Sequence, residues 1–407
     1  MTTKPKAPGS LKDLPPAIWI LAIIAFCVAL GFGIVAPAIP LFARSFGVTA
    51  FAASTVVSIF AFTRLISSPI SGLLIEKIGE RVVLTAGLVI VAITTGAAGA
   101  ADEFTQLLVL RGLSGFGSAM FTISAMSLVV RLAPRELRAR ANSLFQGGFL
   151  TGILFGPALG AAVLAISVRA PFYVYGFTVA IAAIIAAIFL STARTQAPTD
   201  VEPTKANGPN LRLVDGFRHA GYRAAFTVSF TVGFTIFGLR AAAVPLYVTE
   251  ELMAAASLVA FGFFAGSVTQ ITILLPAGKY ADTRGRREAM VIGSVLAVIS
   301  SVLLTVWQSP TGYLISMGMG GFAGAFLSST PAAIVGDVVE GRRRGPLLAA
   351  FQMAADVGGI IGPLIAGLVI DGYGFTATFA MGIVATVIAL IVTLMMPKKH
   401  KPPIVAQ

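Results

Sequence analysis

Long apolar segments recur along the whole chain, separated by short polar and basic segments. Seven of them contain no Asp, Glu, Lys or Arg: 14–43, 82–101, 112–130, 141–168, 170–193, 252–278 and 372–397. A helix needs about 20 apolar residues to cross hydrocarbon about 30 Å thick. Each segment is therefore predicted to contain a transmembrane helix.

The remaining apolar segments complete the pattern. The uncharged stretch 289–336 is too long for one crossing, and its turn-forming residues 308–312 divide it in two. Three more segments are each interrupted by one charge, which is Arg64, Arg240 or Asp356. The pattern predicts twelve spans, at 17–43, 51–75, 82–101, 104–130, 138–166, 170–193, 222–248, 252–281, 288–307, 311–338, 345–370 and 373–396.

Composition supports an all-α polytopic membrane protein. Apolar residues make up 57% of the chain and charged residues 11%, with a mean hydropathy of +0.91, whereas soluble domains are about 25% charged. A single cysteine, Cys27, excludes a disulfide framework, and one cysteine with two histidines excludes a Cys- or His-rich metal site. No P-loop motif is present. We therefore expect no metal or organic cofactor, and a proton gradient as the energy source.

The net charge of +12 follows from topology. Of the 29 basic residues, 24 fall in one set of loops and tails, while the acidic residues Asp102, Glu103, Glu250 and Glu251 fall in the other. Basic loops stay in the cytoplasm, so both termini are predicted to be cytoplasmic, in a bacterial inner membrane. The partners expected are the lipid bilayer and a small solute, without nucleic acid, and we expect a monomer.

An internal repeat relates the two halves of the chain at a constant offset of 206 residues. The offset maps Gly72, Gly79 and Arg81 onto Gly278, Gly285 and Arg287. It also maps Gly156-Pro157 onto Gly362-Pro363. The predicted domains are a six-helix bundle at 1–193, a cytoplasmic linker at 194–221, and a second bundle with a tail at 222–407. Two such parallel repeats bracket a central cavity.

These motifs resemble those of the major facilitator superfamily. Residues 72–81 (GLLIEKIGER) and 278–287 (GKYADTRGRR) resemble its loop signature G-x-x-x-D-R-x-G-R-R, although Glu80 stands where the first copy wants Arg. Residues 111–117 (RGLSGFG) resemble its fourth-helix motif. Residues 152–160 resemble its fifth-helix antiporter motif G-x-x-x-G-P-x-x-G-G, with Ala161 in place of the last glycine. The short drug–proton antiporter branch is the most similar.

The resemblance implies roles for two groups of residues. The loop signatures would form a latch that closes the cytoplasmic side, or else a basic anchor with turn glycines; their residues are Gly72, Glu76, Gly79, Arg81, Gly278, Asp282, Gly285, Arg286 and Arg287. The Gly-Pro motifs would kink and pack helices closely; their residues are Gly152, Gly156, Pro157, Gly160, Gly358, Gly362 and Pro363.

Charges within the spans are costly unless paired or hydrated. The superfamily fold places the second and eleventh helices side by side, so we hypothesise an Arg64–Asp356 pair that forms in one conformation and is weakened by protonation of Asp356. A static salt bridge is the alternative. Arg111 resembles the fourth-helix arginine implicated in proton coupling. Arg240 is a candidate substrate contact, and Arg44 lies near the outer boundary, where it can snorkel.

These observations predict a secondary transporter that moves a small organic or amphipathic solute by alternating access, through proton-coupled export. An uptake permease for a small organic anion is the alternative, favoured by the excess of arginine over acid within the spans. A membrane-embedded transferase would need clustered Asp, Glu or His. The sequence has no such cluster, so we do not expect an enzyme.

Overall fold

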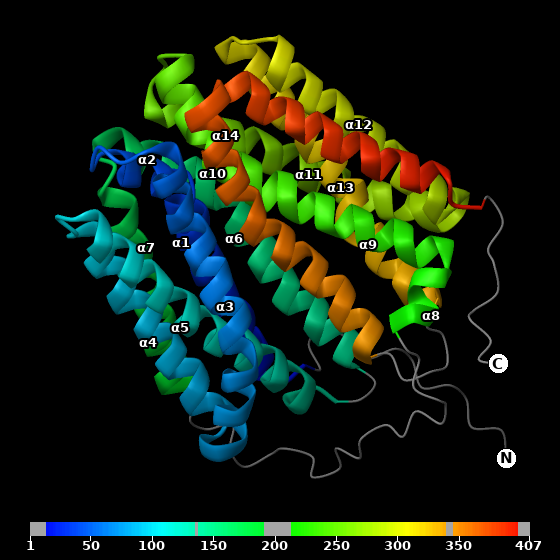
Figure 1. Ribbon diagram of the computed structural model, residues 1–407. Helices are drawn as coiled ribbons and strands as arrows, with labels where there is room; N and C mark the ends of the chain where they lie inside the picture. The colour runs from blue at the N-terminus through cyan, green and yellow to red at the C-terminus, as the bar shows by residue number, and fades with distance from the viewer. Residues whose placement is uncertain (1–13, 135–136, 191–212, 339–344, 398–407) are drawn as a thin grey trace, which may run out of the picture. The chain divides into compact units, whose positions relative to one another are not determined.

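The computed structural model describes residues 14–134, 137–190, 213–338 and 345–397, which are helical apart from short connections (Figure 1). Most of the linker predicted at 194–221 lies outside the described residues. Helices in the first half are α1 (Pro16–Val35), α2 (Ala38–Arg44), α3 (Ala50–Ile78), α4 (Glu80–Gly99), α5 (Phe104–Leu132), α6 (Arg138–Ile166) and α7 (Ala170–Phe189).

The second half begins with a short helix, α8 (Leu213–Arg218), and an irregular seventh span. That span runs through α9 (Ala220–Val232), the π-helix η4 (Gly233–Arg240), α10 (Ala241–Leu246) and the π-helix η5 (Tyr247–Glu251). It is followed by α11 (Ala256–Arg284), α12 (Arg286–Val306), α13 (Pro310–Val338) and α14 (Gly345–Leu394). Gly285 alone separates α11 from α12. Residues 307–309 separate α12 from α13, so the turn predicted at 308–312 lies at the right place but is shorter, because α13 already begins at Pro310.

The last two predicted spans form one continuous element, α14, which turns sharply at Gly374 (Figure 1). Gly374 has a φ of 79°, a left-handed conformation that a residue without Cβ adopts at little cost. Among the described residues, eleven helices are long and apolar enough to cross a membrane, and one of them, Leu347–Leu394, is long enough for two crossings. The prediction of an all-helical, twelve-span protein is confirmed.

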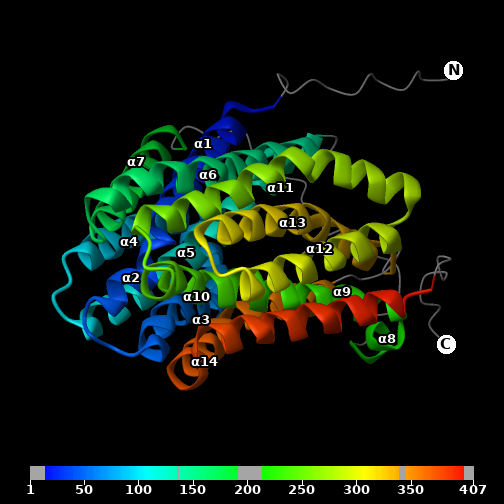
Figure 2. The same ribbon diagram turned by 90° about the horizontal axis from the view of Figure 1, so that it is seen from above.

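The chain divides into two compact units. Among the described residues, the first holds 14–35, 62–134, 137–159 and 169–190, and the second holds 36–61, 160–168, 213–338 and 345–397. In the first unit, α4 packs on α5 and α7, and α1 packs on α7. In the second, α13 packs on both α11 and α12, and α9 with η4 lies along α14 (Figure 2). Residues 36–61, although from the first repeat, thus pack within the second unit.

Large apolar side chains remain exposed along the spans. Ile166, Phe177, Leu275 and Ile388 are among them. In water such a surface would be unfavourable, whereas lipid tails solvate it. The exposed apolar side chains fit a multi-pass membrane protein.

Candidate functional site

The two basic loop motifs adopt the same backbone conformation. Gly79 has a φ of 84° and Gly285 a φ of 118°, so each tight turn uses a conformation that favours glycine. Each turn connects a long helix to the next span, α3 to α4 in the first repeat and α11 to α12 in the second. The matching geometry explains why glycine recurs at the offset of 206.

The arginines after these turns bind the ends of other helices. Arg81 donates a hydrogen bond of 2.7 Å to the carbonyl of Ala187, in the last turn of α7. Arg287 donates to the carbonyls of Met396 (2.6 Å) and Leu394 (2.8 Å), at the end of α14. Carbonyls at a helix C-terminus lack intrahelical partners and carry partial negative charge. Each arginine therefore ties its loop to the end of the last span in its repeat.

An ion pair stands at the same place in both repeats with its charges reversed. Glu80 pairs with Arg131 at 3.1 Å in the first unit, and Arg286 pairs with Asp337 in the second. Adding 206 takes each member of the first pair onto one of the second. Glu80 departs from the family motif, which has a basic residue there. Its partner Arg131 stands where the second repeat has the acid Asp337. The departure is compensated within its own unit.

The acids of the loop motifs and the glycines before them make fewer contacts than the arginines that follow the turns. Glu76 and Asp282 are exposed, and no ion pair of either is found in the described part of the chain. An added Cβ at Gly72 or Gly278 would meet no atom within 4 Å. The latch role of these four residues stays a prediction. The side-chain contacts of the two loop motifs come instead from the residues that follow the turns, Glu80 and Arg81 in one repeat and Arg286 and Arg287 in the other.

In the first unit, the Gly-Pro motif of α6 lies against the backbone of α1. An added Cβ at Gly152 would lie 2.6 Å from the carbonyl oxygen of Phe26, and one at Gly156 would lie 2.7 Å from the Cα of Gly33. Small residues on one face allow helix backbones to approach this closely. Pro157 of the same motif is buried, and so is Gly160, which already belongs to the second unit.

The second unit repeats this arrangement between α14 and the seventh span. Gly358 faces the backbone of Phe230 and Phe234, and an added Cβ at Gly362 would lie 2.8 Å from the Cα of Gly238. Pro363 also lies beside Gly238. The two Gly-Pro motifs therefore share a packing role, against the first span in one repeat and the seventh in the other.

The charged residues predicted for coupling fall in different units. Arg64 lies on α3 in the first unit and Asp356 on α14 in the second, and both side chains are exposed. Their pairing stays a prediction. Arg111 is buried in α5, with 1% of its surface exposed, and lies near the buried Tyr175 of α7.

Arg240, at the last position of η4, is buried in the second unit with 8% of its surface exposed. Its Nη2 donates a 2.7 Å hydrogen bond to the hydroxyl of Ser300. Ser300 in turn donates to the carbonyl of Ser316 (2.6 Å), so its oxygen is held as an acceptor. The hydrogen bond to Ser300 does not bear on a contact between Arg240 and substrate, which stays a prediction.

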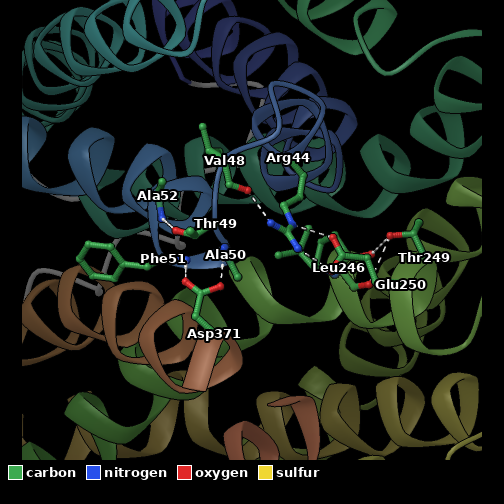
Figure 3. A network of polar contacts seen from close by, with 11 residues as sticks. Arg44, Val48, Thr49, Ala50, Phe51, Ala52, Leu246, Thr249, Glu250 and Asp371 are labelled. Atoms are coloured by element: carbon green, nitrogen blue, oxygen red, sulfur yellow. Dashed lines mark hydrogen bonds and ion pairs between the residues drawn. The ribbon is translucent and has the colours of Figure 1, made fainter. Parts of the chain in front are cut away.

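A polar cluster missed by the sequence analysis lies at the end of the seventh span (Figure 3). We use the name outer cluster for Arg44, Val48, Glu250 and Asp371 with the first residues of α3. Arg44 donates to both carboxylate oxygens of Glu250, at 2.8 and 3.2 Å, and to the carbonyl of Val48. The hydrogen bond to Glu250, opposed by partial burial, raises the pKa of Arg44 above its usual value. The arginine is therefore charged at any physiological pH.

Asp371 completes the outer cluster from the bend of α14. Its two carboxylate oxygens accept hydrogen bonds of 2.8 Å from the backbone N–H groups of Ala50 and Phe51 (Figure 3). These N–H groups open α3 and have no intrahelical partner, and a carboxylate there also interacts favourably with the helix dipole. Asp371 is thus an N-terminal cap supplied by a segment more than 300 residues away. The sequence offered only its isolated charge between two apolar spans.

No group of three His, Cys, Asp or Glu that could hold a metal ion occurs among the described residues.

The family comparison covers nearly the whole chain. The sequence pattern of the Major Facilitator Superfamily matches residues 21–241 and again 225–407. The multidrug efflux protein YfmO of Bacillus subtilis (strain 168) is 24% identical over 403 residues, covering 98% of this chain and 97% of that protein. The quinolone resistance protein NorA of Staphylococcus aureus (strain MSSA476) is 21% identical over 387 residues, covering 94% and 97%.

Solved structures share the fold. A bacterial homologue of the human lysosomal transporter Spinster, in an inward-facing and occupied conformation, superposes with a TM-score of 0.74 at 14% identity, covering 95% of this chain and 97% of that one. The nucleoside transporter NupG (D323A mutant) superposes with a TM-score of 0.70 at 13% identity, covering 93% and 98%. With its two helical repeats and their loop motifs, the chain belongs to the Major Facilitator Superfamily and is a secondary transporter, not an enzyme.

Proposed function

We propose that the protein exports amphipathic organic solutes from the bacterial cytoplasm in exchange for protons. The observation that carries this proposal is the full-length similarity to bacterial efflux proteins, which covers 98% of this chain and 97% of YfmO. The energy source is the proton gradient, and both termini are cytoplasmic because the basic loops lie on their side. The transport unit is the monomer.

Alternating access requires contacts that form at one side of the membrane and break when that side opens. The outer cluster suits such a role at the extracellular end. Arg44 and Glu250 belong to different repeats, yet they share a bidentate, charge-assisted contact. Asp371 holds the start of α3 by two further hydrogen bonds. We infer that these contacts close the extracellular end of the pathway and break when it opens.

Proton coupling is assigned to Asp356, with Arg64 as its conditional partner and the buried Arg111 as a further coupling residue. Asp356 is the one carboxylate well inside a predicted span, at mid-helix between the start of α14 and its bend. A carboxylate in a spanning helix is costly and marks a proton or substrate pathway. Loss of its charge on protonation would weaken its attraction to Arg64 and favour the conformation in which the two are apart.

The test is counter-transport in proteoliposomes under imposed pH and voltage gradients, with ethidium, a zwitterionic quinolone and an organic anion as solutes. We expect ethidium or quinolone movement against proton flow, lost or made independent of pH in Asp356→Asn. Asp102→Asn is the matched control, because Asp102 lies in an exposed connection between spans and its side chain is 83% exposed.

Two results would contradict the proposal. If wild-type transport ignored the pH gradient, proton coupling would be wrong. If only the organic anion moved, together with protons, the uptake permease favoured by the buried Arg111 and Arg240 would replace the exporter.

A further inference from the structure

The short helix α8 presents three apolar side chains at the surface of the second unit, directly before the seventh span. One residue, His219, separates α8 from α9, so α8 lies at the membrane boundary, at the start of the spanning segment (Figure 1). Leu213, Val214 and Phe217 are 45%, 61% and 39% exposed. With about 100° of rotation per residue, these three positions fall within about 100° of the helix circumference. They form one continuous surface, which we call the apolar face of α8.

Another flank of α8 is fixed to the body of the second unit. Gly216 is buried, and an added Cβ there would collide with the side chain of Leu347 at the start of α14. The Tyr222 hydroxyl donates a 2.9 Å hydrogen bond to the carbonyl of Leu347. The Phe217 ring packs edge-on against Tyr222 and Phe226, with centroids 5.4 and 5.0 Å apart. α8 is thus seated on α9 and α14, which hold its apolar face at the surface.

Two arginines stand at the C-terminal end of this apolar face. Arg218 ends α8 and Arg223 lies in the first turn of α9, and both are exposed. Nη1 of Arg223 donates a 3.4 Å hydrogen bond to the carbonyl of Phe217, so its guanidinium lies at the same end of α8 as Arg218. Neither arginine forms an ion pair with another residue in the described part of the chain. Asp215, the one acid of α8, is partly buried, so the exposed charge here is positive.

An apolar face beside two arginines, at the end of a spanning helix, matches the chemistry of an anionic phospholipid. The apolar side chains of such a helix enter the boundary between headgroups and acyl chains, while basic side chains attract anionic lipids. Guanidinium groups also form strong, charge-assisted hydrogen bonds with phosphate. A soluble anion would satisfy the arginines and leave the apolar face uncovered, and a lipid without net charge would do the reverse.

We propose that the apolar face of α8, together with Arg218 and Arg223, binds an anionic phospholipid. The acyl chains cover the apolar face, and the phosphate accepts hydrogen bonds from the two guanidinium groups. Because α8 is seated on Leu347, the bound lipid stabilises the contact between the start of α14 and the seventh span. The inference rests on the spans crossing a membrane, and it is independent of the direction and proton coupling of transport.

The test is quenching of tryptophan fluorescence by brominated lipids, with the full chain in nanodiscs. The two native tryptophans, Trp19 and Trp307, are replaced by Phe, and Val214→Trp places the fluorophore on the apolar face. The discs mix phosphatidylcholine and phosphatidylglycerol, and either lipid carries the bromine. We expect a small fraction of brominated phosphatidylglycerol to quench more than the same fraction of brominated phosphatidylcholine. Ile388→Trp, at an exposed position of α14, is the matched control and should be quenched equally by both.

The arginines account for the preference. A basic residue near an anionic surface contributes about 1 kcal/mol, which is about fivefold in affinity. We therefore expect Arg218→Gln and Arg223→Gln each to lower the preference for phosphatidylglycerol about fivefold, and the double variant to abolish it. Arg284→Gln, an exposed arginine in the last turn of α11 in the same unit, should leave it unchanged. The comparison of the two lipids with both arginines present tests the proposal even if a glutamine variant is unstable.

Four results would overturn the proposal. Equal quenching by the two brominated lipids would make the apolar face an ordinary lipid contact. Loss of the preference when soluble glycerophosphoglycerol is added would assign the arginines to a free anion. Absence of quenching by either lipid would mean that protein, from this chain or from a second copy, covers the face. An unchanged preference in the double arginine variant would remove the guanidinium groups from the site.

Discussion

The ion pair between Arg44 and Glu250 gives a quantitative prediction for the proposed extracellular latch. Both side chains are 34% exposed, so the pair is partly solvated and contributes about 1 kcal/mol to the closed state. Reversing one charge removes this contribution and places like charges in contact, which adds about 1 kcal/mol of repulsion in a largely aqueous setting. The total of about 2 kcal/mol shifts the equilibrium about 30-fold.

The assay is a distance measurement between spin labels in nanodiscs. Cys27 is the single cysteine, so Cys27→Ser gives a clean background for labels at Ser45→Cys and Met253→Cys, both exposed positions beside the outer cluster. If the closed and open states are equally populated in wild type, Arg44→Glu should leave about 3% closed. Glu250→Arg should act alike, and the double reversal should restore the wild-type distribution.

Two controls separate a latch from a general disturbance of the fold. Arg169→Glu changes an exposed arginine whose contact with Asp102 is longer, 3.6 Å, and should leave the distances unchanged. The reasoning is refuted if each single reversal changes the closed population by less than twofold. It is refuted equally if the double reversal behaves like the sum of the two single ones, because a direct pair must show coupling.

The remaining predictions concern packing within each unit. Gly362→Ala places a Cβ 2.6 Å from the carbonyl oxygen of Phe234, so we expect about 1–3 kcal/mol of destabilisation and slower transport; in Gly359→Ala the nearest atom is 3.7 Å away and the melting temperature should hold. For the reversed ion pairs, Glu80→Gln should cost about 1 kcal/mol and lower the melting temperature. The double variant Glu80→Arg with Arg131→Asp copies the pair of the second repeat and should restore the wild-type melting temperature. If it does not, the loss of stability in Glu80→Gln does not come from the ion pair.

Much of the fold could be predicted because the membrane imposes it. Uncharged segments of sufficient length predict spanning helices, and α6 occupies the predicted interval 138–166 without change. The turn glycines at 79 and 285 were predictable as well, since their spacing from the basic residues repeats in both halves. In each case a local requirement, helix length or a left-handed φ, leaves its mark on nearby residues.

The polar contacts of the site could not be predicted in the same way, because their partners are far apart in sequence. Arg44 and Glu250 each read as a charge at a membrane boundary. They stand at equivalent positions of the two repeats, 206 residues apart, but this equivalence does not by itself predict that they are in contact. Asp371 reads as a solvated loop acid, yet it caps α3. Glu80 was recognised as a departure from the motif, but its compensation by Arg131 required the packing of α4 against α5.

The offset between equivalent residues of the two repeats changes along the irregular seventh span. Gly152 contacts the backbone of Phe26, and its repeat equivalent Gly358 contacts that of Phe230, so Phe26 and Phe230 correspond at an offset of 204 residues. In the same way, Gly156 contacts Gly33 and Gly362 contacts Gly238, which correspond at an offset of 205. Gly47 and Met253, which both have a positive φ (75° and 49°), correspond at an offset of 206. The offset rises by one across η4 and by one more across η5.

A π-helix closes its hydrogen bonds five residues apart instead of four, so each π segment accommodates one added residue without shifting the helix faces beyond it. An insertion in a plain α-helix would rotate every later residue by about 100° and separate Gly238 from Gly362. The seventh span therefore accommodates two residues more than the first repeat has over the same stretch, while keeping its glycine contacts. Arg240 ends the first π segment and Glu250 lies in the second. Each π segment thus carries a charged side chain with a polar contact, since Arg240 donates to Ser300 and Glu250 accepts from Arg44.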